Sequence, residues 1–224
     1  LRSPDRMPGL YAISTDTAGE RSFLYWRDRA AVRTLFAPPA LDLDDLAWFD
    51  LVYLSAISLA VLPEEDRQRL LDWLPHYRAD GGRVAFDSNY RPALWADPAL
   101  ARRDIERAWR QTDIGLPSVD DEMALFGDTD EAAVLTRLTG WGVTSGALKR
   151  GDRGPCPLDG SAGPDCPPAP QVIDSTAAGD SFNGGYLAAR LTGADDSEAL
   201  AAGHALAAQV VQQRGALMPR DGEE

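Results

Sequence analysis

The feature that most constrains the fold is an alternation of short apolar segments with longer amphipathic segments, which begins near Leu46 and continues almost to the end of the chain. The apolar segments have the length of buried strands, and those between them have the length and periodicity of helices. Strands that alternate with helices form βαβ units, which build a parallel sheet covered by helices on both faces. The chain is therefore predicted to be an α/β protein whose ligands bind beyond the carboxyl ends of the strands.

The expected elements are placed by their periodicity and by the residues that end them. A helix at 64–79 carries Leu70, Leu71 and Leu74 on one face and is ended by glycine at Gly81. Further helices are expected at 98–111, 120–126, 130–138, 178–191 and 197–213, and strands at 49–54, 83–87, 113–116, 143–149 and 171–174. The segment 155–170 is rich in proline and glycine, so we expect a loop or an irregular hairpin there.

The N-terminal segment 8–27 differs from the rest and is typical of a β-hairpin. Residues 10–13 and 22–26 are rich in aromatic and apolar side chains, and 16–19 supply the turn. The chain starts at Leu1, directly before this strand-like sequence, so we expect that preceding residues are missing.

The charge balance restricts the partners of the chain. The 22 basic and 35 acidic residues give a net charge of −13, which disfavours binding to nucleic acid and to anionic membranes. No apolar run reaches the ~18 residues that a membrane span requires. A phosphate ligand would have to be held by local groups, such as backbone amides, isolated Arg or Lys side chains, or a bound metal ion.

A zinc site is not expected, since His76 and His204 are the only histidines. Cys156 and Cys166 lie in the loop-like segment, where reduced surface thiols of a cytoplasmic protein are favoured over a disulfide.

Residues 174–185, DSTAAGDSFNGG, join small residues to the start of an expected helix. The small side chains at 177–179 let the backbone approach a ligand, and the first amides of a helix lack internal acceptors. With the helix dipole, these amides can bind an anion such as a phosphoryl group in transfer, and Asp180 can accept a proton from an attacking hydroxyl. The same residues also fit a helix that is merely capped, and taken alone they leave both interpretations open.

This segment resembles the C-terminal signature of the ribokinase-like (PfkB) carbohydrate kinases, and its AAGDSFN form is most similar to that of the 2-keto-3-deoxygluconate kinases. Other segments follow in the order of that subfamily, covering nearly the whole chain: the hairpin at 8–27, DSNYRPALW at 87–95, LPSVDDEMALFGD at 116–128, LKRGDRG at 148–154 and the tail at 201–219. The resemblance implies a ribokinase-like core, with a mostly parallel sheet flanked by helices, and a small β lid. It places part of the lid in residues 1–34 and the catalytic core in residues 35–224.

The resemblance also implies roles for individual residues. Asp180 would be the catalytic base and would contact the substrate, and the amides of Ala177, Ala178 and Gly179 would form the anion hole. Tyr11, Tyr25, Arg27 and Arg91 match positions that contact the sugar acid. Arg27 can pair bidentately with a carboxylate, which a neutral sugar does not require. The residues assigned to ATP are Asn89, Lys149, Gly151, Gly154, Ala177, Gly179 and His204.

Some of these residues also fit simpler interpretations. Tyr11 and Tyr25 could be strand aromatics that pack on a neighbour, and His204 could be a structural histidine. A lysine followed by glycines, as at Lys149, is weak evidence because many turns require glycine. Asp87 could cap the turn after its strand or orient Arg91.

The chain departs from the family pattern in two ways. The Asn-x-x-Glu motif linked to magnesium is replaced by Ser118-Val119-Asp120-Asp121, followed by Glu122, so the metal contacts are assigned to Asp121 or Glu122. The family's N-terminal Gly-Gly-Asp loop has no counterpart before Leu1. We therefore expect these residues alone to lack part of the substrate pocket.

The prediction is an ATP-dependent kinase that transfers the γ-phosphoryl group to the terminal hydroxyl of 2-keto-3-deoxygluconate, using Mg²⁺ and optionally a monovalent cation. The resemblance further implies a cytoplasmic enzyme and the option of a homodimer through the lid. Two alternatives remain open: another ribokinase-like kinase, for fructose or a nucleoside, and a non-catalytic sugar-acid sensor of the same fold. No G-x-G-x-x-G follows an early strand, which argues against a dinucleotide oxidoreductase.

Overall fold

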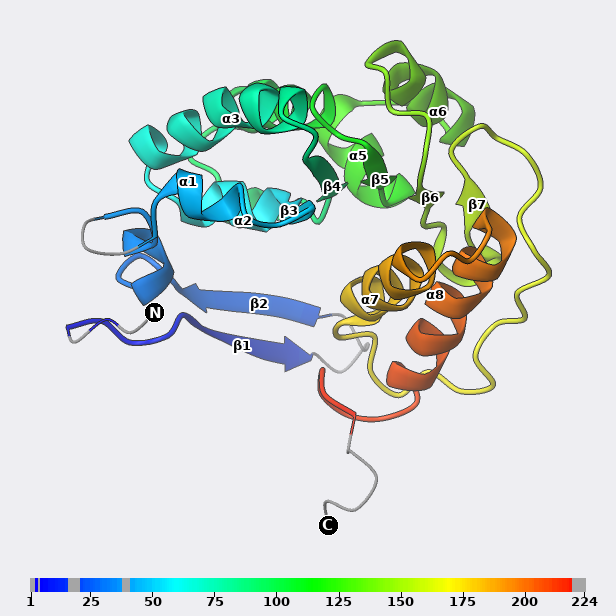
Figure 1. Ribbon diagram of the computed structural model, residues 1–224. Coiled ribbons are helices and arrows are strands. Elements are labelled where there is room, and N and C mark those ends of the chain that lie inside the picture. The colour runs from blue at the N-terminus through cyan, green and yellow to red at the C-terminus, as the bar shows by residue number, and fades with distance from the viewer. Residues whose placement is uncertain (1–2, 4, 16–20, 38–40, 219–224) are drawn as a thin grey trace.

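A three-stranded parallel sheet forms the centre of the computed structural model, which describes residues 3, 5–15, 21–37 and 41–218 (Figure 1). The strands lie in the order β3 (Leu51–Ser55), β4 (Arg83–Asp87) and β5 (Ile114–Leu116). Single parallel bridges from Gly115 to Gly146 and from Ser118 to Lys149 continue the sheet toward β6 (Ala147–Leu148). The predicted α/β fold is thus confirmed.

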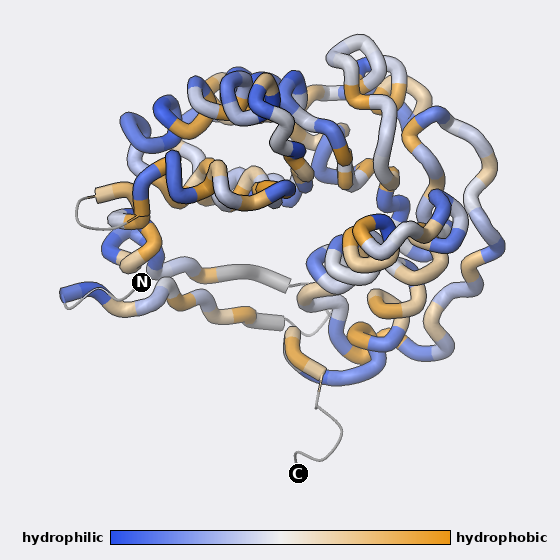
Figure 2. Tube along the Cα trace, in the orientation of Figure 1, coloured by the Kyte–Doolittle hydropathy of each residue, from blue (hydrophilic) through white to orange (hydrophobic). Residues whose placement is uncertain are grey.

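Helices cover both faces of this sheet. On β4, the side chains of Val84 and Phe86 belong to one buried cluster, whereas Ala85 belongs to another, as the alternation of a strand requires. The first cluster lies against the helices α3 (Glu64–Ala79), α4 (Pro98–Trp109), α5 (Val119–Phe126) and α6 (Glu131–Gly140). The second lies against α7 (Ala178–Leu191) and α8 (Asp196–Val210). Figure 2 shows hydrophobic and hydrophilic residues alternating along these helices, as amphipathic packing requires.

The helix ends follow the signals in the sequence. Asp97, Asp130 and Asp195 cap α4, α6 and α8 through side-chain hydrogen bonds to amides of the first turn. Gly127 ends α5 in the left-handed conformation, with φ of 80°. The shorter elements are α1 (Leu43–Leu46), α2 (Ala56–Val61), β7 (Cys156–Pro157), η1 (Ala31–Thr34), η2 (Pro92–Leu94) and η3 (Gly151–Arg153).

The N-terminal hairpin consists of β1 (Leu10–Thr15) and β2 (Arg21–Trp26), paired antiparallel with Tyr11 opposite Tyr25. The turn predicted at 16–19 lies outside the described residues. In Figure 1 the hairpin lies on the side of the sheet where α7 and α8 pack. Its exposed side chains include Leu10, Leu24 and Trp26.

Two predictions about the C-terminal half were wrong. Residues 171–174 do not form a strand: the amides of Ile173 and Asp174 both donate to the carbonyl of Val211 at the end of α8 instead of to a neighbouring strand. The strand expected at 143–149 is reduced to Ala147–Leu148, which pairs with β7 at the start of the segment predicted as a loop or irregular hairpin.

The cysteines are both free, but only one approaches the surface. Cys166 is half-buried, whereas Cys156 is buried, contrary to the prediction of two surface thiols. Burial raises the pKa of the Cys156 thiol to about 11, so this thiol stays protonated and is a poor nucleophile. Among the described residues, none of the helices has the length and apolar character needed to cross a membrane.

Candidate active site

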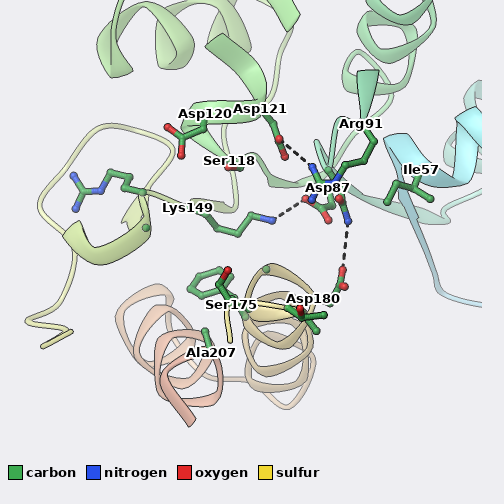
Figure 3. A pocket seen from close by; sticks show the side chains of 18 of the residues that line it. Ile57, Asp87, Arg91, Ser118, Asp120, Asp121, Lys149, Ser175, Asp180 and Ala207 are labelled. Atoms are coloured by element: carbon green, nitrogen blue, oxygen red, sulfur yellow. Dashed lines mark hydrogen bonds and ion pairs between the residues drawn. The ribbon is translucent and has the colours of Figure 1, made fainter. Parts of the chain in front are cut away.

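A cavity of about 570 Å³ opens at the carboxyl edge of the parallel sheet. Its walls come from the residues that follow β4, β5 and β6, from the first turn of α7, and from the hairpin. Figure 3 shows these side chains converging from separate elements. The structure brings most of the predicted site residues to this cavity: Tyr11, Tyr25, Arg27, Asn89, Arg91, Asp121, Lys149, Gly151, Ala177, Ala178, Gly179, Asp180 and His204.

The first turn of α7 presents unsatisfied amides to the cavity. Ala177 precedes the helix in the left-handed conformation, with φ of 62°, and thereby turns the backbone into the helix. The amide of Ala178 donates to the carbonyl of Ser175, but within the described chain the amides of Ala177 and Gly179 have no backbone acceptor. Free amides and the helix dipole together favour an anion at this point. Of the three amides predicted to form the anion hole, those of Ala177 and Gly179 are available to an anion in the described chain, and that of Ala178 is already bonded.

The backbone is strained at two residues that line the cavity. Among the described residues, the non-glycine residues with positive φ are Asn89, at 23°, and Ala177, and both line the cavity. Conformations of this kind cost about 1–3 kcal/mol each and persist where function requires them. The side chain of Asn89 donates to Asp180 Oδ1 at 3.5 Å, whereas its own oxygen is buried and has no hydrogen-bond partner among the described residues. Asn89 thus connects the end of β4 to the candidate base.

The environment of Asp180 tunes its acidity. Desolvation in the cavity raises the pKa of the Asp180 carboxyl, and the Asp87 carboxylate raises it further, whereas Lys149 and Arg91 lower it. The net direction is upward from the ordinary aspartate value, which brings the carboxylate nearer to the acidity of an effective general base.

The raised pKa of Asp180 predicts where activity is lost on the acidic side of the pH profile, called here the acid limb. Because only ionised Asp180 can accept a proton, activity falls as pH drops through its raised pKa, at a higher pH than an ordinary aspartate would give. Asp87→Asn removes a neighbouring negative charge and should move this limb to lower pH. The measurement is kcat/KM against pH from about 4 to about 8 for the parent and the variant. A limb that stays in place, or moves upward, would contradict the assignment.

Behind Asp180 lies a group of polar side chains that sequence reasoning largely missed. Lys149 Nζ donates to Asp87 Oδ1 at 2.7 Å and to Asn183 Oδ1 at 3.2 Å. Tyr53 donates to Asp87 Oδ2 at 3.3 Å and accepts a hydrogen bond from Asn183 Nδ2 at 3.1 Å. Asp87 is 1% exposed, so neither a surface cap nor an ordering role for Arg91 describes it: its partner is Lys149.

The acidic pair after β5 divides between the cavity and the core. Asp121 faces the cavity and accepts a hydrogen bond from Arg91 Nη1 at 3.2 Å, and the exposed Asp120 lies beside it (Figure 3). Glu122 turns the other way and is buried, where it accepts hydrogen bonds from Trp109 Nε1 at 3.2 Å and from Arg137 at 2.9 Å. The structure therefore does not bring Glu122 to the cavity, because successive side chains on a helix are rotated by about 100° and Asp121 and Glu122 point in different directions.

Arg137 is expected to be a major determinant of stability. Its guanidinium pairs with Glu122 and Asp128 and lies over the Phe126 ring, 4.0 Å from the centroid. Arg137→Met would leave Glu122 buried without a cation, and we expect a loss of about 3–5 kcal/mol in the free energy of unfolding. Urea denaturation measures this loss.

A matched control is Arg110→Met. Arg110 also lies over the Trp141 ring, at 5.6 Å, but its ion-pair partner Glu106 is on the surface. We expect a loss of less than about 1 kcal/mol. Equal losses for the two variants would contradict the structural role assigned to Arg137.

The hairpin contributes one cation and two aromatic rings. The Arg27 guanidinium lies 5.5 Å from the ring centroid of Tyr11 and 5.2 Å from that of Tyr25. Stacking on two rings holds a guanidinium in place while leaving its donors free for a ligand. In the described part of the chain, no carboxylate lies within ion-pair distance of Arg27. The positive charge of Arg27 at the cavity therefore has no carboxylate partner among the described residues.

The opposite end of the cavity is formed by a glycine turn and by α8. Gly151 lines the cavity with φ of 64°, but Gly154 is buried behind it, where its carbonyl accepts a hydrogen bond from Arg150 at 2.8 Å. His204 Nε2 lies 2.7 Å from the carbonyl of Pro167 and also borders the cavity. The structure thus brings Gly151 and His204 to the site and leaves Gly154 to shape the turn.

Fold and site together define a class of protein. An open parallel sheet, helix amides without backbone acceptors among the described residues and an adjacent carboxylate with a raised pKa suit phosphoryl transfer to a hydroxyl. The chain is a ribokinase-like kinase. It matches the model of the pfkB family carbohydrate kinases over residues 1–221 and belongs to that family.

Individual relatives agree with this assignment. The chain is 44% identical to the 2-dehydro-3-deoxygluconokinase of Escherichia coli K12, over 98% of its own length and 74% of the relative's length. It is 44% identical to the enzyme of that name from Dickeya dadantii, over 97% of the chain and 73% of the relative. Among solved structures it resembles an Escherichia coli protein provisionally described as ribokinase II, in complex with ATP and Mg²⁺. The TM-score is 0.75 at 25% identity, and the match covers 88% of the chain and 63% of that structure.

Proposed function

We propose that this protein phosphorylates 2-keto-3-deoxygluconate, also called 2-dehydro-3-deoxygluconate, on its terminal hydroxyl with ATP as the phosphoryl donor. The observation that carries the proposal is the placement of Arg27 and Asp180 on one cavity. Arg27, which has no carboxylate partner in the described part of the chain, would bind the carboxylate of a sugar acid, and Asp180 would be the base for its hydroxyl. The named activity of relatives that are 36–44% identical supports it.

The reaction uses the chain's own groups in separate roles. Asp180 takes the proton of the hydroxyl as the oxygen attacks the γ-phosphorus, the bond from that phosphorus to the ADP oxygen breaks, and ADP leaves with the electron pair. The free amides of Ala177 and Gly179 stabilise the charge of the transferred group. Lys149 adds a positive charge beside this turn, and Asn89, Gly151 and His204 border the space for the nucleotide.

Magnesium fits the donors at this edge of the sheet. Asp120 and Asp121 line the cavity, but the described residues contain no group of three His, Cys, Asp or Glu side chains that could hold a metal by themselves. Mg²⁺ usually keeps several waters and binds through one or two carboxylates together with nucleotide phosphates. When bound, it would neutralise phosphate charge, and Asp121 and Asp120 are the residues that would hold it. A requirement for a monovalent cation stays a prediction.

The hairpin is proposed to act as part of a lid over the sugar acid, with residues 35–224 as the catalytic core. Tyr11, Tyr25 and Arg27 reach the cavity from the hairpin, which supports this division. Closing over the substrate would exclude water, which otherwise competes with the sugar for the phosphoryl group. The exposed apolar side chains of the hairpin suit a second subunit, but a homodimer through the lid and a cytoplasmic location remain predictions.

A substrate comparison tests the proposed function. Phosphorylation is measured with 2-keto-3-deoxygluconate, with fructose and with a nucleoside, each with Mg²⁺ and ATP. We expect kcat/KM for the sugar acid to exceed the others by at least about 100-fold, because a charge-assisted pair to Arg27 is available only to the acid. Equal turnover of acid and neutral sugar would overturn the acid assignment, and no turnover of any of them would favour a non-catalytic sensor.

A further inference from the structure

Four side chains from four separate parts of the fold close a ring of hydrogen bonds behind the cavity. Lys149 donates to Asp87 and to Asn183, Asn183 donates to Tyr53, and Tyr53 donates to Asp87. The four residues come from the end of β6, the end of β4, the second turn of α7 and the middle of β3. No member can rotate without breaking two hydrogen bonds, so the ring fixes the direction of each side chain.

The ring places one charged group beside the anion-binding turn. A Cβ atom at Gly179 would lie 3.7 Å from Lys149 Nζ, so the ammonium stands directly against the first turn of α7. Lys149 lines the cavity, whereas Tyr53 and Asn183 are not among the residues that line it. A lysine side chain is long and flexible and loses much rotamer freedom when it is fixed. Its orientation therefore depends on Asp87, which lines the cavity, and on Tyr53 and Asn183, which do not.

A contribution to stability alone does not account for this arrangement. Buried ion pairs such as Asp87–Lys149 are often no more stabilising than apolar residues of similar volume, because both charges must be desolvated. Here two further polar side chains complete the network, and Asn183 is only 2% exposed. A fully connected polar network in place of apolar packing fixes geometry rather than adding stability.

We propose that Tyr53 and Asn183 are positioning residues, which hold Asp87 and Lys149 so that the ammonium faces the transferred phosphoryl group. Lys149 contacts the anion and the two positioning residues act through it. This role rests on the proposed function, because it assumes that a phosphoryl group occupies the turn. The ring itself exists in the free protein and can be tested there.

The first test uses the fact that Lys149 is the only lysine in the chain. Acetylation by an N-hydroxysuccinimide ester, followed by mass spectrometry of the peptide that contains Lys149, reports on this one side-chain amine. In Tyr53→Phe and in Asn183→Leu the ring is broken, and we expect Lys149 to react about fivefold faster or more, the equivalent of one lost hydrogen bond. Tyr186→Phe is the control, since it removes from α7, the helix of Asn183, a buried hydroxyl that has no hydrogen-bond partner in the part of the chain that the structure describes.

The second test measures kinetics in the same variants. We expect kcat to fall about tenfold in Tyr53→Phe, with KM for the sugar acid within about twofold of the parent, because the lost interaction acts on the transferred group. Tyr186→Phe should match the parent. If Lys149 reactivity is unchanged in both ring variants, or if kcat is unchanged in Tyr53→Phe, the positioning role is overturned. Asn183→Leu replaces a buried residue, so Tyr53→Phe on the edge strand keeps the test decisive if that variant fails to fold.

The two proposals fail separately. A parent protein that does not phosphorylate the sugar acid would overturn the proposed function, whereas the reactivity of Lys149 would still show whether the ring holds it. If the parent is active and Lys149 is equally reactive in all variants, only the positioning role of the ring would be overturned.

Discussion

Asp180→Asn is expected to lower kcat by about 10³-fold, within the range of 10²–10⁴ that a positioned general base contributes. The substitution preserves the size of the side chain and its place in the first turn of α7, but an amide cannot accept the proton of the attacking hydroxyl. The KM values for the sugar acid and ATP should change by less than about threefold, because the base acts in the transition state. Steady-state kinetics with 2-keto-3-deoxygluconate measure both parameters.

The control for this variant is Asp196→Asn, a carboxylate in the first turn of the next helix, α8. Asp196 pairs with Arg190 at the surface, at 3.1 Å, and does not line the cavity. We expect parent-like kinetics for it, which separates the role of Asp180 from a general effect of charge near a helix N-terminus. A loss of less than tenfold in Asp180→Asn would show that another group, or water, accepts the proton.

The parts of the site that lie close together in the sequence could be predicted from it. Residues 174–185 contain the turn, the free amides and the base within one short segment, so local rules about helix starts identify them. The hairpin is equally local, and its register places Tyr11 opposite Tyr25. The alternation of strands and helices then brings the ends of β4 and β6 to the same edge of the sheet as this turn.

The parts that depend on distant contacts could not be predicted. Tyr53 is 34 residues from Asp87 and 130 residues from Asn183, and in the sequence it is one aromatic residue in an apolar strand. The direction of Glu122 also depended on the tertiary structure, because a helix that starts at Val119 sends adjacent acidic residues to different faces. The apolar residues at 171–174 predicted a strand that does not form. Val172 is 63% exposed, and the amides of Ile173 and Asp174 donate to the carbonyl of Val211 at the end of α8.

The choice between an acidic and a neutral sugar is expected to depend on one side chain. Arg27 is held over two tyrosine rings and lacks a carboxylate partner among the described residues, so the positive charge is available to a ligand. A charge-assisted hydrogen bond contributes roughly 1.5–3 kcal/mol, and a bidentate pair contributes two of them in a fixed geometry. The carboxylate of the substrate does not react, so this binding energy should act through KM.

Arg27→Met should therefore lower kcat/KM for 2-keto-3-deoxygluconate by about 100-fold or more, mainly through KM, because about 3 kcal/mol corresponds to two factors of ten. Methionine keeps an apolar chain of similar length against the Tyr11 and Tyr25 rings, so the loss reports on charge rather than on packing. For a neutral sugar the same substitution should leave kcat/KM within about threefold.

The matched control is Arg29→Met. Arg29 is exposed near the hairpin and does not line the cavity, so its substitution should change neither value. Equal losses for the acid and the neutral sugar in Arg27→Met would mean that Arg27 supports the shape of the hairpin instead of recognising a carboxylate, and the substrate assignment would then fall back to sugars in general.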